Sequence, residues 1–167
     1  MPFKKIDISS FELNPFTKIG EEWFLLSAGK ENDFNTMTAA WGGMGVMWNR
    51  NIFTAVIRPS RHTFKFMEEN DKFSACFFGN SNREDLKYCG SHSGRNEDKI
   101  SHTSLNPVFI DGVPAFEEAK TIFICKKIYR GEIDENSFID NSLFEYYKSD
   151  TFHVVFIGEI LEILEKE

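Results

Sequence analysis

The chain has 167 residues and a mass of 19.3 kDa, which is the size of one domain, and 41% of its residues are hydrophobic. Its 26 acidic and 19 basic residues give a net charge of −7, so it lacks the overall positive charge of a general nucleic-acid binder. No window approaches the ~20 apolar residues of a membrane-spanning helix, and the first residues lack the apolar stretch of a secretory signal. We therefore expect a single domain over residues 1–167 that binds neither nucleic acid nor membranes.

Aromatic residues make up 15% of the chain, and 18 of them are phenylalanine. Rings in this number indicate aromatic-rich strands, a pocket for a flat ligand or a large apolar interface. The three cysteines, Cys76, Cys89 and Cys125, are an odd count and lie far apart, and Cys76 and Cys125 fall in apolar runs that are typical of buried positions. A reducing, cytoplasmic location is the simplest interpretation.

Short β-rich runs follow one another along the chain. We expect strands at residues 22–28, 34–48, 52–58, 72–78, 121–129 and 152–164, and short helices at residues 60–70 and 82–90. The strand at residues 34–48 should bend at Gly42-Gly43-Met44-Gly45, and turns should follow at residues 49–51 and at Asp111-Gly112. Six to eight strands with two short helices indicate a mainly β, mostly antiparallel barrel rather than a Rossmann fold, because the alternating βαβ pattern is absent from the sequence.

The first chemically informative segment is Asn35-Thr36-Met37-Thr38-Ala39-Ala40-Trp41-Gly42. Alanine and glycine are poor strand formers, so their presence in a strand suggests that something packs close to the backbone. A flat heteroaromatic ring could lie there and form hydrogen bonds with the main chain at its edge. The same small residues could instead let a barrel bend or two subunits approach each other, and the sequence leaves both interpretations open.

A second segment reads Arg58-Pro59-Ser60-Arg61-His62-Thr63. Two guanidinium groups, two hydroxyls and the start of a helix fall within six residues, and together they could bind a phosphate. A local cluster of positive charge in an acidic protein favours that interpretation. The alternative is an ordinary helix start that is capped by Ser60 or Thr63, with the arginines in solvent.

A third segment, Cys89-Gly90-Ser91-His92-Ser93-Gly94-Arg95-Asn96-Glu97-Asp98-Lys99, opens a polar loop that extends to Thr103. Its serines, histidine and arginine could close over a phosphate or another polar group, and a solvated loop is the alternative. The segment matches neither a P-loop nor a nucleophile elbow. Cys89, His92 and His102 hint at a metal site, but a second Cys/His pair at ligand spacing is missing from the sequence, so we expect no metal.

Taken in order, these segments resemble the flavin reductase-like, FMN-binding split-barrel family, close to its flavoredoxin branch. Further matching motifs are Gly45-Val46-Met47-Trp48-Asn49, Gly112-Val113-Pro114-Ala115-Phe116-Glu117-Glu118-Ala119 and Ile157-Gly158-Glu159-Ile160. The resemblance covers residues 24–160 and rests on the joint order and spacing of the motifs, not on any single one.

The resemblance implies a homodimer of split β-barrels with FMN at or near the dimer interface. Arg58, Ser60, Arg61 and Thr63 would hold the phosphate, and the isoalloxazine would lie against the backbone of Met37-Thr38-Ala39-Ala40. Trp41 or Trp48 would lie near the ring, Asn35 and Thr36 begin the same cofactor-binding segment, and the later loop would contribute Ser91, Ser93 and Arg95.

The family passes reducing equivalents between NAD(P)H, flavin and acceptors, so we expect an FMN-binding oxidoreductase that uses NAD(P)H to reduce flavin or another acceptor. The alternative is a flavoredoxin-type electron carrier that is reduced by a redox protein partner and has little NAD(P)H activity of its own. A third interpretation is a barrel without flavin whose aromatic residues form a dimer interface. Because hydride transfer to a flavin needs no protein nucleophile or general base, we assign no catalytic residue.

Overall fold

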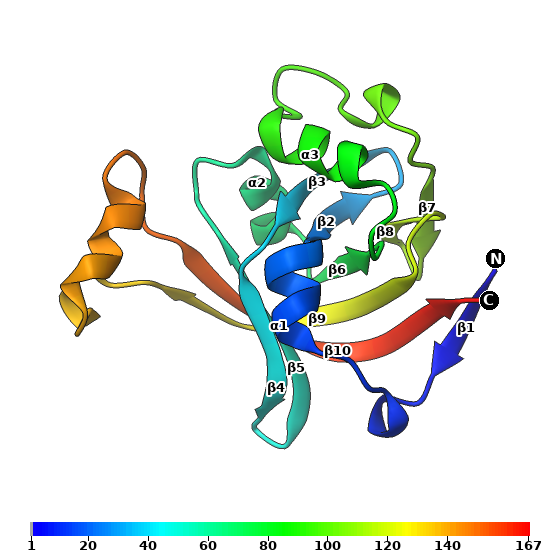
Figure 1. Cartoon of the computed structure of the whole chain (residues 1–167), viewed down its shortest axis with the longest axis horizontal. Coiled ribbons are helices and arrows are strands. Elements are labelled where there is room, and N and C mark those ends of the chain that lie inside the picture. The colour runs from blue at the N-terminus through cyan, green and yellow to red at the C-terminus, as the bar shows by residue number, and fades with distance from the viewer. Residues whose placement is uncertain (1) are drawn as a thin grey trace.

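The structure is a computed structural model that describes residues 2–167 (Figure 1). Its strands are β1 (Phe3–Ile6), β2 (Phe24–Lys30), β3 (Asp33–Ala39), β4 (Gly42–Met47), β5 (Arg50–Ile57), β6 (Lys72–Phe77), β7 (Pro107–Ile110), β8 (Val113–Phe116), β9 (Thr121–Glu132) and β10 (Val154–Lys166). The α-helices are α1 (Pro15–Thr17), α2 (His62–Glu69) and α3 (Arg83–Ser91). A π-helical turn, Lys18–Glu22, continues α1, and 3-10 turns cover Ile8–Ser10, Ile100–His102, Glu135–Ser137 and Asn141–Tyr147.

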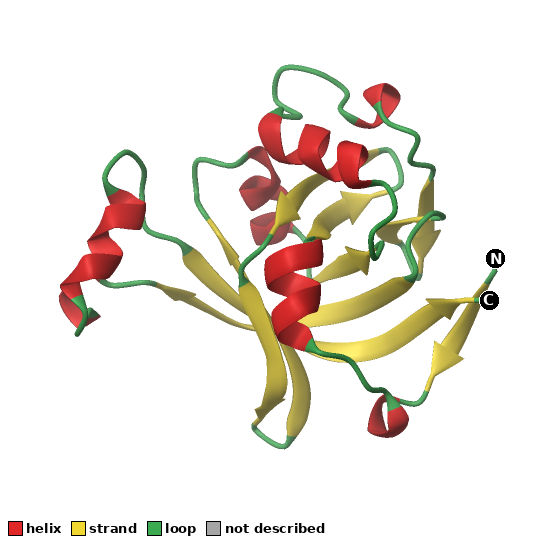
Figure 2. Ribbon diagram, in the orientation of Figure 1, coloured by secondary structure: helices red, strands yellow, loops and turns green. Residues whose placement is uncertain are grey.

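The main sheet is antiparallel and runs in the order β3-β2-β6-β9-β10-β5-β4, with β1 paired to the end of β10. It curls into a barrel, and β7 and β8 form a separate hairpin beside it (Figure 2). Although β3 and β4 are consecutive in sequence, they stand at opposite ends of this order. The barrel is therefore split between them, as expected, and the chain crosses the split at Ala40 and Trp41.

The long bent strand that we expected at residues 34–48 is wrong, because β3 ends at Ala39 and β4 starts at Gly42. Gly42 has φ +148°, and a Cβ atom there would lie 2.5 Å from the carbonyl oxygen of Thr54. Only glycine fits this close approach to β5, so the change of direction falls before the glycine run and not within it.

The turn expected at residues 49–51 lies one residue earlier. Trp48 and Asn49 both have positive φ, 53° and 56°, which is the backbone of a two-residue hairpin turn between β4 and β5. The turn at Asp111-Gly112 is confirmed between β7 and β8. Helix α3 continues through Gly90 to Ser91, one residue beyond its expected end.

Two apolar clusters cover the two faces of the sheet. The cluster inside the barrel is rich in phenylalanine, and the Phe24 ring contacts Phe53 and Phe77 at centroid distances of 5.4 and 5.2 Å. The second cluster lies outside the barrel, under α3 and the β7–β8 hairpin. All three cysteines are free and buried, as the apolar runs around two of them indicated. No helix in residues 2–167 is long and apolar enough to cross a membrane.

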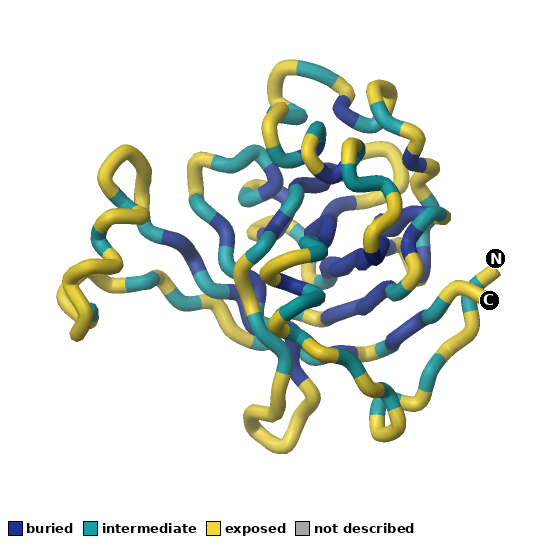
Figure 3. Tube along the Cα trace, viewed as in Figure 1, coloured by how far each residue is buried: buried dark blue, intermediate teal, exposed yellow. Residues whose placement is uncertain are grey.

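An arm, which we define as residues 133–153, projects from the barrel between β9 and β10 (Figure 1). Its rings pack on one another, with Phe152 5.7 Å from Phe138 and 4.6 Å from Tyr147 between centroids. Nevertheless, none of residues 133–152 is buried, and Ile139 is completely exposed (Figure 3). The arm also carries five acidic side chains and one basic side chain. The sequence pattern did not predict this element.

Candidate functional site

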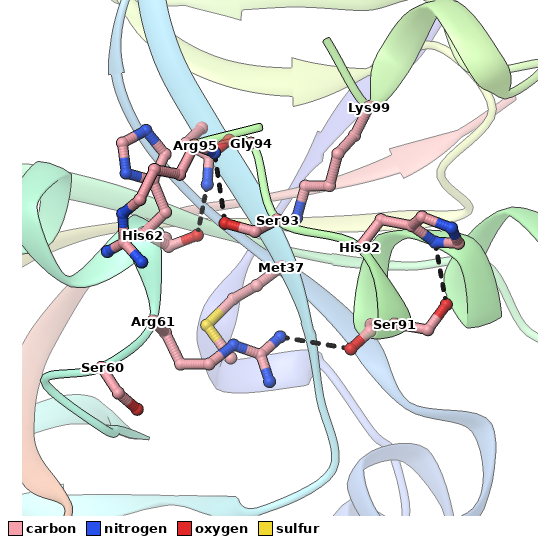
Figure 4. A pocket seen from close by; sticks show the side chains of 13 residues that line it. Met37, Ser60, Arg61, His62, Ser91, His92, Ser93, Gly94, Arg95 and Lys99 are labelled. Carbon is pink, nitrogen blue, oxygen red and sulfur yellow. Dashed lines mark hydrogen bonds between the residues drawn. The ribbon is translucent and has the colours of Figure 1, made fainter. Parts of the chain in front are cut away.

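A polar cavity of about 200 Å³ lies between the start of α2, the end of α3 and the loop that follows it (Figure 4). We call it the anion cavity. It is lined by Asn35, Met37, Ser60, Arg61, His62, Thr63, Gly90, Ser91, His92, Ser93, Gly94, Arg95 and Lys99. Side chains from three separate segments therefore converge here, and all three segments are those that the sequence had singled out.

The anion cavity collects positive charge. Arg61, Arg95 and Lys99 line it, and no lining residue, all of which the structure describes, is a carboxylate. Burial lowers the pKa of the Lys99 ammonium from its usual 10.5 to about 8, and the charge of Arg61 acts in the same direction. Burial also lowers the pKa of His62, to which the charges of Arg95 and Lys99 contribute. An anion bound here would offset the repulsion between these cations and stabilise their charged forms against burial.

Lys99 is the most buried of these cations, with 4% of its surface exposed. Its ammonium donates a hydrogen bond to the carbonyl oxygen of Cys89 at 3.0 Å, near the end of α3. Because this bond uses one of the three N–H groups of the ammonium, the other two are available to a ligand. Arg61 also reaches this helix end, with a long contact of 3.4 Å from Nη2 to the Gly90 carbonyl.

Two local interactions fix the walls of the cavity. The side-chain amide of Asn35 donates to the hydroxyl of Thr63 at 2.8 Å, which ties β3 to α2. The loop backbone at Gly94 lies so close to Asn35 that a Cβ atom there would be 2.2 Å from Asn35 Oδ1. The expectation that Thr63 or Ser60 caps α2 is wrong, because Arg61 occupies the N-cap and no side chain caps the helix.

A second cavity of about 250 Å³ continues from the first along the end of β3, and we call it the ring cavity. It is lined by Met37, Thr38, Ala39, Ala40, Trp41, Val56, Arg58, Arg61 and His153. Met37 and Arg61 line both cavities, so the two adjoin. Because β3 stands at the end of the sheet order, one edge of its backbone pairs with no strand of the described residues, and the small side chains of Ala39 and Ala40 leave space beside it.

His153 forms the far side of the ring cavity. Its ring lies 5.0 Å from that of Trp41, and its Nδ1 shares a 2.7 Å hydrogen bond with the Tyr147 hydroxyl. Burial, with a contribution from the charge of Arg58, lowers the pKa of His153 to about 4. The imidazole is therefore neutral at pH 7.

The arm occupies two of the residues that we expected to hold a phosphate. The Arg58 guanidinium donates to the carbonyl oxygens of Tyr146 at 2.6 Å and Thr151 at 3.2 Å. The Ser60 hydroxyl donates to Asp150 at 2.8 Å, and this bond is the main reason that the pKa of Asp150 is lowered. Arg58 lines only the ring cavity, so the expected cluster of four residues does not converge on one point.

The structure thus brings most of the predicted site residues together. The anion cavity contains Asn35, Met37, Ser60, Arg61, Thr63, Ser91, Ser93 and Arg95, and the ring cavity contains Met37, Thr38, Ala39, Ala40, Trp41, Arg58 and Arg61. Thr36 lies beneath them, 1% exposed, and its hydroxyl accepts from Ser27 at 2.7 Å. Trp48 lies at the tip of the β4–β5 hairpin beside Tyr129 and lines neither cavity.

The sequence analysis did not assign Lys99, His62 or His153 to the site, and it named His92 only as part of the polar loop. His62 lies inside the second segment and Lys99 inside the third. Burial of a lysine in a polar loop is not visible in a sequence, because it depends on how the loop folds over α3 and β3.

The chemistry of the two cavities fits FMN. The anion cavity offers cations and hydroxyls that suit a phosphate, and the adjoining ring cavity offers an accessible strand backbone, small side chains and an indole that suit a flat ring system. Individually the cavities are small, but together they span the volume of an ordinary ligand site.

Comparison with known proteins gives a consistent result. The family model described as flavin reductase like domain matches residues 17–167. An FMN-binding protein from Thermus thermophilus, solved with bound p-hydroxybenzaldehyde, is 21% identical with a TM-score of 0.69 and is matched over 98% of this chain and 82% of that chain. Flavoredoxin of Desulfovibrio vulgaris is 22% identical with a TM-score of 0.69, over 98% of this chain and 78% of that chain. An FMN-binding domain of a flavin reductases-like enzyme from Shewanella baltica is 15% identical with a TM-score of 0.70, and the match covers 98% of this chain and 77% of that chain. No curated protein sequence matches the chain.

Proposed function

Because the chain belongs to the flavin reductase like domain family, we propose that it is an FMN-binding oxidoreductase that passes reducing equivalents from NAD(P)H to flavin or another acceptor. The single observation that carries this proposal is the junction of the two cavities. A cavity with three cations adjoins a cavity along an accessible strand backbone, and FMN has an anionic end and a flat end in the same order.

In this proposal, Arg61, Arg95 and Lys99 bind the phosphate. The hydroxyls of Ser91 and Ser93 line the same cavity and could add hydrogen bonds. Arg58, contrary to our first expectation, holds the arm in place and contributes a positive field to the ring cavity. Met37 and Arg61 lie where the phosphate end and the ring end of the ligand would meet.

When bound, FMN would supply both hydride and single-electron chemistry. The residues of the ring cavity would position it and exclude water on one side. Main-chain groups of Thr38, Ala39 and Ala40 would bond the polar edge of the ring. His153, which is neutral at pH 7, leaves Arg58 and Arg61 as the charged groups of this cavity. We assign no residue as a general acid or base.

A flavoredoxin-type electron carrier is the second candidate function. Two of the similar solved structures are flavoredoxins, from Methanosarcina acetivorans and Desulfovibrio vulgaris, which supports this alternative. In that case a redox protein partner, not NAD(P)H, would reduce the bound flavin.

We also propose that the chain forms a homodimer in the cytoplasm. The arm supports the dimer, because its aromatic and aliphatic side chains are not buried within one chain, and such a surface is typical of an interface. Three free, buried cysteines suit a reducing compartment. Size-exclusion chromatography with light scattering would measure the mass, and a monomer would contradict the dimer.

The function is tested by adding FMN to the purified protein, removing unbound flavin and recording the absorbance spectrum. Anaerobic addition of NADH or NADPH should then bleach the retained flavin bands and identify the preferred donor. Retained bands that only dithionite or a reduced ferredoxin bleaches would favour the electron carrier. A protein that retains no flavin and does not accelerate flavin reduction by NAD(P)H would refute the proposal.

A further inference from the structure

A third cavity shares Ala40 and Trp41 with the ring cavity, and we call it the apolar cavity. Its volume is about 410 Å³, larger than either cavity of the proposed flavin site. Its walls include Pro15, Phe16, Ile19, Trp41, Gly43 and Met44, so it lies between α1, its π-helical continuation and the first residues of β4. Trp41 and Ala40 line both this cavity and the ring cavity.

The lining restricts the class of ligand. No residue around the apolar cavity, all within the described part of the chain, has an ionisable side chain, and the indole N–H of Trp41 is the one side-chain hydrogen-bond donor there. A charged ligand would lose its hydration without gaining a partner, which is costly. The anion cavity, with its three cations, has the opposite character. The two cavities therefore select different molecules.

Aromatic surface is displayed at this cavity, although apolar rings are usually buried. The Phe16 side chain is 84% exposed and Trp41 is 44% exposed. Phe16 is held at the rim by local structure, because Pro15 begins α1 and the Asn14 side chain accepts a hydrogen bond from the Phe16 N–H at 3.0 Å. The adjoining π-helical turn is a rare conformation that is frequent at functional sites.

The packing of the chain does not depend on leaving the apolar cavity empty. A Cβ atom at Gly43 would have no protein atom within 4 Å, so a larger residue could stand there without a clash. Gly42 differs, because its φ of +148° and the nearby Thr54 carbonyl demand glycine. A larger side chain at Gly43 could therefore fill part of the apolar cavity without a clash, and such a variant can test whether a ligand binds there.

We propose that the apolar cavity binds an uncharged, planar aromatic molecule of one or two fused rings, which stacks on Trp41 and is covered at the rim by Phe16. The shared wall would place this molecule next to the ring cavity. A molecule of this class that carries a quinone would take two electrons and two protons from reduced flavin and leave as the hydroquinone, and this role, unlike the binding site itself, rests on the proposed function.

The test compares two probes that share a ring system and differ in charge, 2-naphthol and naphthalene-2-sulfonate. Isothermal titration calorimetry at pH 7 would measure their binding to the protein with and without FMN. With FMN added to occupy the anion cavity, we expect one 2-naphthol per chain and a sulfonate affinity at least about tenfold weaker, because the charge cannot be paired in the apolar cavity. Equal affinities, or no binding of 2-naphthol, would overturn the proposal.

Variants then locate the binding. Gly43→Val fills the cavity and should weaken 2-naphthol at least about tenfold, whereas Gly45→Val, two residues along the same strand and also in open space, should change it less than about twofold. Phe16→Ala removes an exposed ring, so folding should be intact, and should weaken 2-naphthol by about threefold or more. Unchanged affinity in both cavity variants would overturn the site.

Two further readouts separate this inference from the proposed function. If Gly43→Val weakens FMN as much as 2-naphthol, the cavity belongs to the flavin site and the inference fails. If Gly43→Val changes the mass in solution, a second copy covers the cavity and the inference also fails. If the protein binds no FMN but 2-naphthol binding remains sensitive to Gly43→Val, the site stands and only its role as an acceptor site falls.

Discussion

Replacing Lys99 by methionine removes one positive charge from the anion cavity and keeps a side chain of similar length. Lys99 is 4% exposed and its ammonium is held by the Cys89 carbonyl, so little reorganisation is needed to meet a phosphate. A charge-assisted hydrogen bond of this kind contributes about 1.5–3 kcal/mol, which corresponds to a roughly 10- to 150-fold change in the dissociation constant. We therefore expect Lys99→Met to weaken FMN by that factor and riboflavin, which has no phosphate, by less than about threefold.

Lys99 should also make the affinity for FMN depend on pH, which can be checked independently. The pKa of Lys99 without ligand is about 8, so its charge is lost as the pH rises through 8. The phosphate keeps its charge there, because its second pKa is about 6. FMN affinity of the unmodified protein should therefore fall from pH 7 to pH 9, and the fall should be much smaller in Lys99→Met.

Quenching of flavin fluorescence, titrated for both flavins at several pH values, measures both effects. Lys126→Met, which changes an exposed lysine on β9, controls for the altered net charge. Equal losses for FMN and riboflavin would show that Lys99 acts on the fold or on the ring and not on the phosphate. An FMN affinity within threefold of the unmodified protein would refute the assignment altogether.

Three further predictions concern the arm, the barrel and a buried histidine. Arg61→Ala should weaken FMN binding by at least about tenfold. Arg58→Ala breaks the bonds to the Tyr146 and Thr151 carbonyls and should chiefly speed proteolysis within the arm. Equal effects of the two variants on FMN affinity would contradict this division of roles. Gly158→Ala places a Cβ atom 2.7 Å from the Phe73 ring, so the free energy of unfolding in urea should fall by about 1–3 kcal/mol, against no significant change for Gly45→Ala. His153 binds its proton with a pKa of about 4 in the folded chain and near 6.5 in the unfolded chain, so stability should fall as the pH falls from 6.5 towards 4. His153→Gln should reduce that slope, and an unchanged slope would show that His153 is not the cause.

The three chemically distinctive segments could be located from the sequence because each combines residue types that a strand, turn or helix does not need for folding. The split barrel and the family were predicted from their order and are confirmed. Where the individual side chains of these segments lie could not be predicted as well from the sequence. Arg58 and Arg61 stand three residues apart, yet the turn before α2 directs Arg61 into the anion cavity and Arg58 towards the arm.

Trp48 shows a different limit. It lies inside the matching motif Gly45-Val46-Met47-Trp48-Asn49, and the resemblance implied a place for it near the proposed ring. The positive φ of Trp48 and Asn49 instead places the hairpin turn there and moves the indole to the hairpin tip. Tryptophan rarely adopts positive φ, so residue preference alone favoured a turn at residues 49–51.

The contacts of Arg58 and Ser60 imply that the arm and the proposed flavin site are thermodynamically linked. Asp150 accepts from Ser60, which lines the anion cavity, and Tyr146 packs edge-on against Trp41, which lines the ring cavity, at 5.3 Å. A ligand that orders these walls also orders the base of the arm, and a partner that fixes the arm lowers the cost of ordering the walls. Because such coupling is reciprocal, FMN should tighten the proposed dimer by the same factor by which dimerisation tightens FMN. Equilibrium sedimentation with and without FMN measures the first factor, and a dilution series of flavin titrations measures the second. If FMN does not tighten the dimer, or tightens it by the same factor in Arg58→Ala, which removes the bonds from Arg58 to the arm, the arm is not the link between dimer and cofactor.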